Sequence, residues 1–588
     1  MYKIITQRIQ ELREIMKHIG VNAYFISGTD PHLSEYPPEY WNSRAFISGF
    51  TGSSGTVIIS ENEAALWTDS RYFIQAEAEL QGTGIQLMKI NMPETPSHSE
   101  WLKKILTSGS IAGTDAMCIS ASQFQILKND LCTSDISLKD TRDLLESIWE
   151  SRPPLPVSQV FVHDIQYEGK SRMEKISNVR EKLKVLKADF AVVTALDDLA
   201  WLFNLRGNDV MFNPVFIGYA IIKHDSAVLY INPQKLHNNV KNELAKDGII
   251  IKPYEDVFSD LPLMKGNACV DIKHTNQSLF GLLTEKTTAS VVAEMKSVKS
   301  DLELQHIKET MKRDGVAMID FLYWIDQNIG KREVTEYDLS LKIEYFRSLQ
   351  YHFKGPSFDT IVGYNENGAI VHRRVTNDNA VSVSREGILL FDSGGQYLTG
   401  TTDITRTICL SSPTPQQKQD FTLILKGLIA LTSVVFPQGT KGTNLDIMAR
   451  QAMWQYGINY GHGTSHGIGY FLCVHEGPIS IRQEYNEYPI LPGMVLSNEP
   501  GIYRQGKYGM RTENMMVCVE KMKTDSGTFF GFETLTLCPI DKQLIDRNIL
   551  TETEIDWINK YHQQCFDELS LLLDKDKVCF LEKLTSEI

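Results

Sequence analysis

The sequence lacks several features that would define a class of protein at once. Its 588 residues contain no run of about 18 uncharged apolar residues, so no membrane-spanning helix is expected. Basic residues number 59 against 73 acidic ones, a net charge of −14. This deficit argues against a general nucleic-acid binder, because no basic excess offsets phosphate repulsion. The first helical stretch carries charges throughout and has no apolar core, so no secretory signal is expected.

Closely spaced cysteine pairs are also missing. The nine cysteines are odd in number and scattered, and no two of them form a Cys-x-x-Cys motif. A disulfide framework or a zinc knuckle is therefore not expected, and a reducing cytoplasm is the default location.

The composition is that of a globular protein, with 42% apolar and 22% charged residues. Its first half holds a weak internal repeat. A helical stretch, 4–19, precedes strand-like runs and an Asp-containing turn, and a second helical stretch, 172–186, precedes the same series. Two similar α/β domains, 1–150 and 151–299, explain the repeat most simply, with the proline-rich segment 151–156 as their linker.

The second half, 300–588, mixes helix-start signals with short strand-like runs. Four helix starts are predicted from a Ser or Thr followed three positions later by Glu, Asp or Gln: Ser300, Thr335, Thr414 and Thr443. Strand-like runs cover 388–391, 404–410, 495–497 and 515–520. This mixture favours an α+β domain. The tail from Thr551 predicts one helix and then a charged, frayed end.

Five residues of the second half form the candidate chemical site. Each stands at the end of a strand-like run or beside glycines: Asp392, Asp403, His466, Glu499 and Glu513. Four carboxylates and one imidazole suit two hard or borderline divalent ions, such as Mn²⁺ or Co²⁺. The charges balance, because four carboxylates supply −4 and two divalent ions supply +4. Without metal, the converging carboxylates would repel one another.

Taken one at a time, these residues have ordinary structural explanations. Asp392 precedes Ser-Gly-Gly and fits a hairpin turn, and Glu499 precedes a proline and fits a surface loop. His466 fits a hydrogen-bonded core histidine. The spacing alone does not force the five side chains together.

Two other catalytic patterns overlap the same segment. Residues 463–467 read Gly-Thr-Ser-His-Gly, the form of a serine-hydrolase elbow, but a predicted helix precedes the segment and glycines follow it. His462 and His466 have the spacing of an H-E-x-x-H zinc site, yet no glutamate follows His462. Neither pattern has its required context.

The order of the motifs carries a resemblance that the single residues do not. FDSGG, TTDITRT, GHGTSHGIGYFLCVHEGP, SNEPGIY and RTEN follow one another, and LWTDSRYFIQA, LAWLFNLRGNDVMFNPVFIGYAII and GFETLTLCPID lie outside them. With this set the chain resembles the pita-bread metallopeptidases, and among them the three-domain Xaa-Pro aminopeptidases (aminopeptidase P). The resemblance implies two creatinase-like α/β domains ahead of a pita-bread catalytic domain with a C-terminal extension.

The resemblance also implies a reaction and a ligand set. The reaction is hydrolysis of the bond between an N-terminal residue and a penultimate proline, by a hydroxide bridging two divalent ions. The five candidate residues match the family's metal ligands. Asp403 and Glu513 would bridge the ions, Asp392 would hold one ion, and His466 and Glu499 would hold the other. The expected metal is Mn²⁺, the expected substrates are peptides, and the expected assembly is a cytoplasmic homodimer.

Further residues match the family's catalytic and substrate-binding positions. His372, His462 and His475 are implied to bind substrate and move protons, which suits side chains that titrate near neutrality. His475 would stabilise the oxyanion, and Glu499 would accept the proton of the attacking water. For His372, an exposed histidine beside two arginines is the alternative.

Two arginines complete the candidates. Arg511 matches a family arginine that steadies the site, with a surface arginine as the alternative. Arg71 lies in the first-domain stretch LWTDSRYF, and its cation would favour a peptide carboxylate at the far end of the substrate. An ion pair with Asp69 inside its own domain is the alternative.

Two other functions stay open within the resemblance. Prolidase resembles the same catalytic domain with one N-terminal domain, so the second repeat copy and the extension after Glu513 favour the aminopeptidase. A catalytically inactive pita-bread binding protein is the other alternative, and the presence of all five ligands argues against it.

Overall fold

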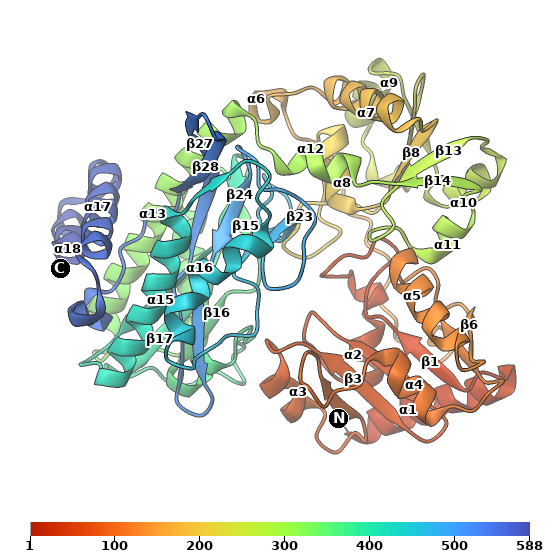
Figure 1. Ribbon diagram of the computed structural model, residues 1–588, viewed down its shortest axis with the longest axis horizontal. Coiled ribbons are helices and arrows are strands. Elements are labelled where there is room, and N and C mark those ends of the chain that lie inside the picture. The colour runs from red at the N-terminus through yellow and green to blue at the C-terminus, as the bar shows by residue number, and fades with distance from the viewer. Residues whose placement is uncertain (1) are drawn as a thin grey trace. The chain divides into compact units, whose positions relative to one another are not determined.

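The computed structural model describes residues 2–588 and divides them into two compact units (Figure 1). The N-terminal unit extends to His163 and resumes at Lys170–Val292. The C-terminal unit comprises Ala293–Ile588 together with the short segment Asp164–Gly169. Among residues 2–588, no helix combines the length and the apolar character that crossing a bilayer requires.

The N-terminal unit contains two six-stranded sheets with the same strand order. The first runs β4-β3-β2-β1-β5-β6 and the second runs β12-β11-β10-β8-β13-β14. The strands of the first are β1 (Ala23–Ile26), β2 (Thr56–Ser60), β3 (Ala64–Thr68), β4 (Gln86–Lys89), β5 (Ile111–Thr114) and β6 (Ser137–Asp140). Those of the second are β8 (Phe190–Val193), β10 (Tyr219–Lys223), β11 (Ala227–Tyr230), β12 (Ile249–Lys252), β13 (Asn267–Val270) and β14 (Glu285–Thr288).

The two sheets also share their strand directions. In the first, β1 pairs antiparallel with β2 and parallel with β5. In the second, β8 pairs antiparallel with β10 and parallel with β13. The expected repeat of two α/β domains is therefore confirmed, strand by strand.

Helices accompany both sheets. They are α1 (Tyr2–Ile19), α2 (Ser43–Ser48), α3 (Phe73–Glu79), α4 (His98–Ile105), α5 (Ala121–Cys132), α7 (Arg172–Leu186), α8 (Leu196–Phe203), α9 (Asn238–Lys246), α10 (Val257–Asp260) and α11 (Gln277–Gly281). The buried residues of α1 are Ile5, Ile9, Leu12 and Met16. This spacing of three and four gives the helix one apolar face, which it packs into the core of the first sheet.

The two halves of the N-terminal unit are joined through main-chain hydrogen bonds. The amide of Ala121 donates to the carbonyl oxygen of Thr275 at 2.9 Å, and the amide of Gln277 donates to that of Ile119 at 3.0 Å. The buried side chain of Asn276 donates to the carbonyl oxygen of Pro31 at 2.8 Å. These bonds hold the two repeats together as one unit.

The C-terminal unit surrounds a six-stranded sheet, β21-β28-β27-β24-β22-β23, with smaller sheets β16-β17-β20 and β15-β18-β19 and a pair β25-β26. Its strands are β15 (Phe353–Pro356), β16 (Ile361–Tyr364), β17 (Ile388–Ser393), β18 (Gly395–Tyr397), β19 (Gly400–Thr401), β20 (Ile404–Cys409), β21 (Val435–Pro437), β22 (Ser465–Gly467), β23 (Glu476–Ile481), β24 (Val495–Asn498), β25 (Gly501–Arg504), β26 (Tyr508–Arg511), β27 (Asn514–Thr524) and β28 (Gly527–Thr534). The expected α+β architecture is confirmed.

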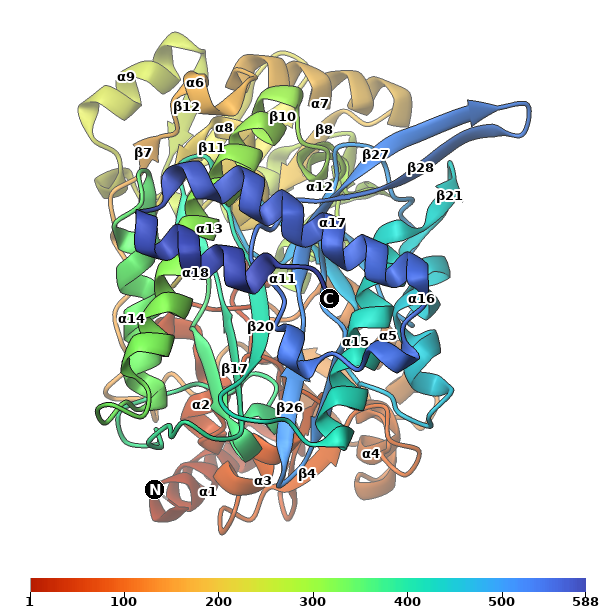
Figure 2. The same ribbon diagram turned by 90° about the vertical axis from the view of Figure 1, so that its left-hand side faces the viewer.

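The long helices of this unit are α13 (Asp301–Asn328), α14 (Glu336–Ser348), α15 (Pro415–Ser433), α16 (Gly442–Trp454), α17 (Glu552–Leu569) and α18 (Lys575–Thr585). Between α13 and β17, the rings of Phe321 and Phe391 meet edge to face at 5.2 Å. Figure 2 shows α17 and α18 side by side, and both contact α13. The last helices of the chain therefore cover the core that supports β17.

Three of the four predicted helix starts are confirmed. Ser300, Thr335 and Thr414 each cap their helix. The cap hydroxyl accepts a hydrogen bond from the amide three residues later, and the side chain of that later residue accepts one from the cap amide. Such reciprocal bonds satisfy amides that would otherwise lack partners.

Two local predictions are wrong. α16 begins at Gly442 instead of after Thr443, because Lys441 is the cap and the Asn444 side chain accepts its amide. The Thr443 hydroxyl donates instead to the carbonyl oxygen of Glu484. The expected frayed tail is the ordered helix α18, because Leu581 is buried there and Lys577 pairs with Asp320 of α13 at 2.6 Å.

Candidate metal centre

Neighbouring strands of the C-terminal unit carry the first two predicted ligands. Asp392 lies in β17, and Asp403 immediately precedes β20. These two strands pair antiparallel, with Asp392 opposite Thr405. The two carboxylates therefore come from adjacent strands of one small sheet.

The other three ligands lie at the ends of strands in the large sheet. His466 lies in β22, Glu499 directly follows β24, and Glu513 directly precedes β27. β24 pairs with β22 on one side and with β27 on the other, which brings the three positions together. The amide of Glu513 donates to the carbonyl oxygen of Thr405 at 3.1 Å, which joins the large sheet to the small one at the site.

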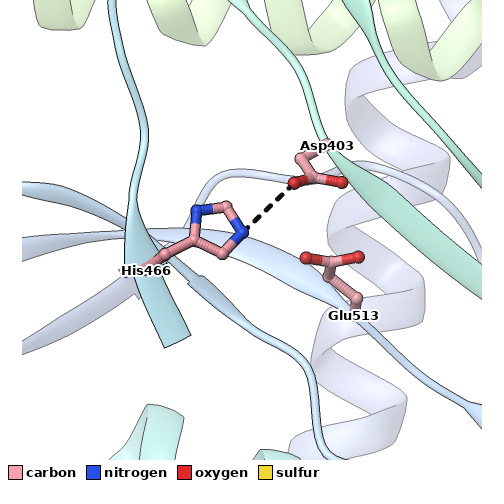
Figure 3. A group of neighbouring side chains, drawn as sticks. All are labelled: Asp403, His466 and Glu513. Atoms are coloured by element: carbon pink, nitrogen blue, oxygen red, sulfur yellow. Dashed lines mark ion pairs between the residues drawn. The ribbon is translucent and has the colours of Figure 1, made fainter. Parts of the chain in front are cut away.

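The side chains converge (Figure 3). Ligand atoms of Asp403, His466 and Glu513 all lie within 4.8 Å of one another. Nε2 of His466 is 3.4 Å from an oxygen of Asp403 and 3.5 Å from an oxygen of Glu499. Nδ1 of His466 donates to the carbonyl oxygen of Gly467 at 2.9 Å, so Nε2 is the nitrogen left to bind a cation.

The electrostatics of the cluster are unbalanced. Burial, and next the charge of Asp392, raises the pKa of Asp403 well above its ordinary value. Burial, and next the charge of Asp403, does the same to the pKa of Glu513. Burial raises the pKa of Glu499 to about 7. The carboxylates thus exceed the nearby positive charge, which is the condition that bound divalent cations relieve.

One oxygen of the cluster has the chemistry of a cation ligand. Asp392 is 7% exposed, and among the described residues its Oδ1 finds no hydrogen-bond partner. Its Oδ2 accepts a hydrogen bond from Arg511. A buried carboxylate oxygen without a partner is costly, and a cation at Oδ1 would supply that partner.

Arg511 is a buried part of the site. It is 1% exposed and pairs with Asp392, so the alternative of a surface arginine is wrong. It also donates to the hydroxyl of Thr405 at 3.0 Å and to the hydroxyl of Tyr503 at 2.7 Å. Tyr503 in turn bonds Nε2 of His462 at 2.8 Å. Sequence reasoning missed Tyr503, although it ends the motif SNEPGIY.

A second set of contacts fixes Glu513. The hydroxyl of Thr405 donates to its carboxylate at 2.8 Å. The buried guanidinium of Arg406 donates to its carbonyl oxygen at 2.6 Å and to the side chain of Asn514 at 2.7 Å. The same guanidinium donates to the hydroxyl of Tyr561 in α17 at 2.8 Å. The C-terminal extension is thereby bonded to the backbone of a predicted metal ligand.

The three predicted histidines occupy different places in the C-terminal unit. The half-buried ring of His475 lies 4.4 Å from that of His466, edge to face. His462 is half-buried, and its Nδ1 donates to the carbonyl oxygen of Gly463 at 2.7 Å. His372 is half-buried in the segment that follows the short helix η5 (Asn365–Ala369).

Arg71 lies in the N-terminal unit, where it makes a two-pronged ion pair. Its Nε and Nη2 each donate to an oxygen of Asp69 at 2.8 Å, and Glu35 lies 3.9 Å away. The ion pair with Asp69, named above as the alternative, is therefore present in the structure.

The two competing catalytic patterns lack their structural context. Ser465 lies within strand β22 instead of in a turn from a strand to a helix, which excludes a serine-hydrolase elbow. His462 and His466 are not on a helix, so the H-E-x-x-H arrangement is also excluded.

Comparison with known families matches nearly the whole chain. The model described as metallopeptidase family M24 matches residues 305–520, and the C-terminal region of that peptidase matches 528–588. Two models of the creatinase/prolidase N-terminal domain match 8–148 and 151–303.

Relatives extend over the full length. The probable Xaa-Pro aminopeptidase P of Neurospora crassa is 40% identical, covering 97% of this chain and 87% of the relative. That of Sordaria macrospora is also 40% identical, covering 97% of each. The crystal structure of an X-prolyl aminopeptidase from Caenorhabditis elegans, described as a cytosolic enzyme with a di-nuclear active site, has a TM-score of 0.96 at 32% identity. It covers 99% of this chain and 100% of its own.

Another solved structure matches less of the chain. The Xaa-Pro dipeptidase from Bacillus anthracis is 22% identical with a TM-score of 0.51, and it covers 63% of this chain, a likeness of fold alone. Two creatinase-like domains, a pita-bread domain with converging carboxylates, and full-length relatives agree. The chain belongs to metallopeptidase family M24, in its three-domain form typified by Xaa-Pro aminopeptidase P.

Proposed function

We propose that the chain is a metal-dependent aminopeptidase that removes the N-terminal residue from peptides whose second residue is proline. The observation that carries this proposal is the buried, under-neutralised carboxylate cluster around His466. It occurs in a chain whose full-length relatives are named Xaa-Pro aminopeptidase P. The di-nuclear site of the Caenorhabditis elegans enzyme supports two ions per chain.

The proposed metals are two divalent ions, Mn²⁺ in preference, because the donors are mainly carboxylates. Asp403 and Glu513 would contact both ions, Asp392 would contact one, and His466 and Glu499 would contact the other. When bound, such a pair supplies a hydroxide nucleophile at neutral pH and polarises the scissile carbonyl.

The remaining steps belong to side chains of this chain. Glu499 would take the proton of the attacking water, and His475 would donate a hydrogen bond to the developing oxyanion. His372 and His462 would line the subsites around the scissile bond. Arg511 would hold the carboxylate of Asp392 in place. A penultimate proline presents a tertiary amide without an N–H, so the site must recognise ring shape instead of that donor.

The remaining parts of the proposal concern assembly and place. We infer a homodimer, a cytoplasmic location and domain limits of 1–150, 151–299 and 300–588. The cytosolic description of the Caenorhabditis elegans relative supports the location. Sedimentation of the purified chain should give about twice the mass of the 66.7 kDa protomer, and a mass near one protomer at micromolar concentration would contradict the dimer.

The experiment that tests the function uses the full chain, Mn²⁺ and the tripeptide Arg-Pro-Pro. Mass spectrometry should detect free arginine and Pro-Pro, and a chelator should abolish both products. The dipeptide Arg-Pro serves as the control for prolidase activity. Cleavage of the dipeptide without cleavage of the tripeptide would favour prolidase, and no cleavage with two ions bound would favour a binding protein.

A further inference from the structure

The two histidines nearest to the metal centre share one hairpin. His466 lies in β22 and His475 directly precedes β23, so residues 465–481 form a unit that we call the histidine hairpin. The hairpin is tight, because Gly467 pairs with Glu476 and a side chain at Gly467 would lie 2.4 Å from the carbonyl oxygen of Glu476. Whatever holds this hairpin therefore fixes both imidazole rings.

One attachment lies at the residue after His475. The carboxylate of Glu476 accepts a hydrogen bond from Lys299, and Nζ of Lys296 lies 3.4 Å from its second oxygen. All three residues are at most 4% exposed. The amide of Lys299 donates to the carbonyl oxygen of Gly493 at 3.0 Å, so this lysine is itself fixed to the C-terminal unit.

A second attachment lies at the tip of the hairpin. The hydroxyl of Tyr470 donates to the carbonyl oxygen of Tyr167 at 2.9 Å and accepts a bond from Nδ1 of His306 at 2.8 Å. Tyr470 is 2% exposed. Tyr167 belongs to α6 (Ile165–Glu168), and His306 belongs to α13.

Both attachments come from segments at which the chain passes between the N-terminal and the C-terminal unit. Tyr167 lies in Asp164–Gly169, the short segment of the C-terminal unit whose sequence neighbours on both sides belong to the N-terminal unit. Lys296 and Lys299 lie just after Val292, where the chain leaves the N-terminal unit for the last time. Each of the two segments through which the chain enters the C-terminal unit therefore contacts the histidine hairpin.

We propose that Lys299 and Tyr470 are positioning residues that couple the entry segments of the C-terminal unit to the histidine hairpin, and so set the placement of His475. The proposal rests on the function proposed above. The lysine acts through Glu476, and the tyrosine acts through the backbone of the hairpin tip. Because a misplacement of about 1 Å at a reacting group can cost about 10²-fold in rate, a loosened hairpin is expected to lower kcat while leaving substrate binding nearly intact.

The test compares two disrupting variants and one conservative variant with two matched controls in the full-length, Mn²⁺-loaded protein. Lys299→Met removes one of the two lysine charges that face Glu476, and Lys299→Arg restores it. Tyr470→Phe removes one hydroxyl and leaves no buried charge behind. Lys426→Met is the control for the lysine. Lys426 pairs with Glu554 at a distance of 2.7 Å, and neither residue belongs to the histidine hairpin. Tyr364→Phe is the control for the tyrosine, because its hydroxyl also makes two bonds, to Ser384 and to the carbonyl oxygen of Glu386.

Three readouts are measured on each variant: kcat and KM for Arg-Pro-Pro, bound metal by elemental analysis, and hydrogen exchange of residues 465–481. Lys299→Met should lower kcat about 10-fold or more, and Tyr470→Phe about 3-fold or more, with KM within about 2-fold. Both should speed amide exchange in the hairpin without changing the metal content. Lys299→Arg should recover most of the activity, and both controls should behave as the wild type.

The proposal is overturned if hairpin exchange and kcat in both variants match those of the controls. If Lys299→Met does not fold, Tyr470→Phe alone decides the outcome by the same criteria. If the wild type fails to cleave Arg-Pro-Pro, the proposed function is wrong, and hairpin exchange still decides whether the two attachments hold the hairpin.

Discussion

Two sets of charged side chains, one buried in the C-terminal unit and one partly exposed in the N-terminal unit, treat charge in opposite ways. In the metal centre, burial and neighbouring carboxylates raise the pKa of Asp403 and Glu513. In the N-terminal unit, burial also acts on Asp69 and Asp271, but hydrogen bonds from Arg71 and His274 lower the pKa of each carboxyl. The matched pairs need no further ligand, whereas the carboxylate surplus is complete only with added cations. The difference separates structural charge from functional charge within one chain.

The largest expected effect comes from removing a bridging carboxylate from the surplus. Asp403→Asn should lose more than one of two bound ions and at least about 10³-fold in kcat, because one oxygen pair would serve both cations. Elemental analysis and peptide cleavage measure the two losses, and Mn²⁺ should restore the chelated wild type best. Full metal content and full activity in the variant would contradict the assignment of Asp403.

The second-largest effect is expected from a substitution that removes none of the clustered carboxylates. His475→Ala should lower kcat by about 10²-fold while both ions stay bound, since removing one transition-state stabiliser typically costs that much. Steady-state kinetics with parallel metal analysis separate the two quantities. An unchanged kcat would reduce His475 to a structural neighbour of His466.

A third effect contrasts the two regions by pH in the metal-free protein. A carboxyl whose folded pKa is raised contributes stability below its unfolded pKa, near 4, and loses it as pH rises through the folded value. For Glu499 that value is about 7, so the Tm of metal-free protein should fall by a few degrees between about pH 5 and pH 8.

The Asp69–Arg71 pair should show the opposite sign. The lowered pKa of Asp69 gives stability that is present above pH about 4 and lost only as pH falls further. Asp271 behaves likewise at low pH, but the pKa of its partner His274 is raised, so that pair also loses stability as pH rises through the folded pKa of His274. Calorimetry with and without Mn²⁺ checks both directions. A metal-free Tm that rises from pH 5 to pH 8 would contradict the contrast.

The smallest effect is expected for Arg71. Arg71→Ala breaks a partly exposed ion pair with Asp69, so unfolding should become easier by about 1 kcal/mol and KM should stay constant. Denaturant titration and kinetics on tripeptides and longer peptides measure both. A KM that rises for tripeptides more than for long peptides would instead support the substrate role.

Local signals in the sequence predicted local structure well. The cap at Ser300 was predictable because its partner Glu303 lies within one turn of the same helix. Thr443 fits the same pattern and is not a cap, because a distant carbonyl, that of Glu484, takes its hydroxyl. The tail could not be recognised as α18 because its partner Asp320 lies far back in the sequence, on α13.

In the candidate site, too, some features could be predicted from the sequence and others could not. The five candidate ligand positions were predicted from the order of motifs. The structure places Asp403, His466, Glu499 and Glu513 close together and pairs Asp392 with Arg511. The supporting contacts did not follow. Arg511 meets Tyr503, eight residues earlier, only because β25 and β26 pair as a hairpin, a register that the motifs did not predict. Lys299 and Glu476 lie 177 residues apart, so no local pattern joins them.

The bond from Arg406 to Tyr561 has a consequence for the order in which the molecule is made. Domains form largely as units while the chain leaves the ribosome, the N-terminal ones first. The two repeated sheets have all their strands by residue 288, long before Glu513 has been synthesised. Because the guanidinium that holds the backbone of Glu513 also bonds a hydroxyl of α17, we expect the predicted ligand cluster to be completed only near the end of translation. We therefore expect any metal to be loaded late, after the first half of the chain has had the chance to fold.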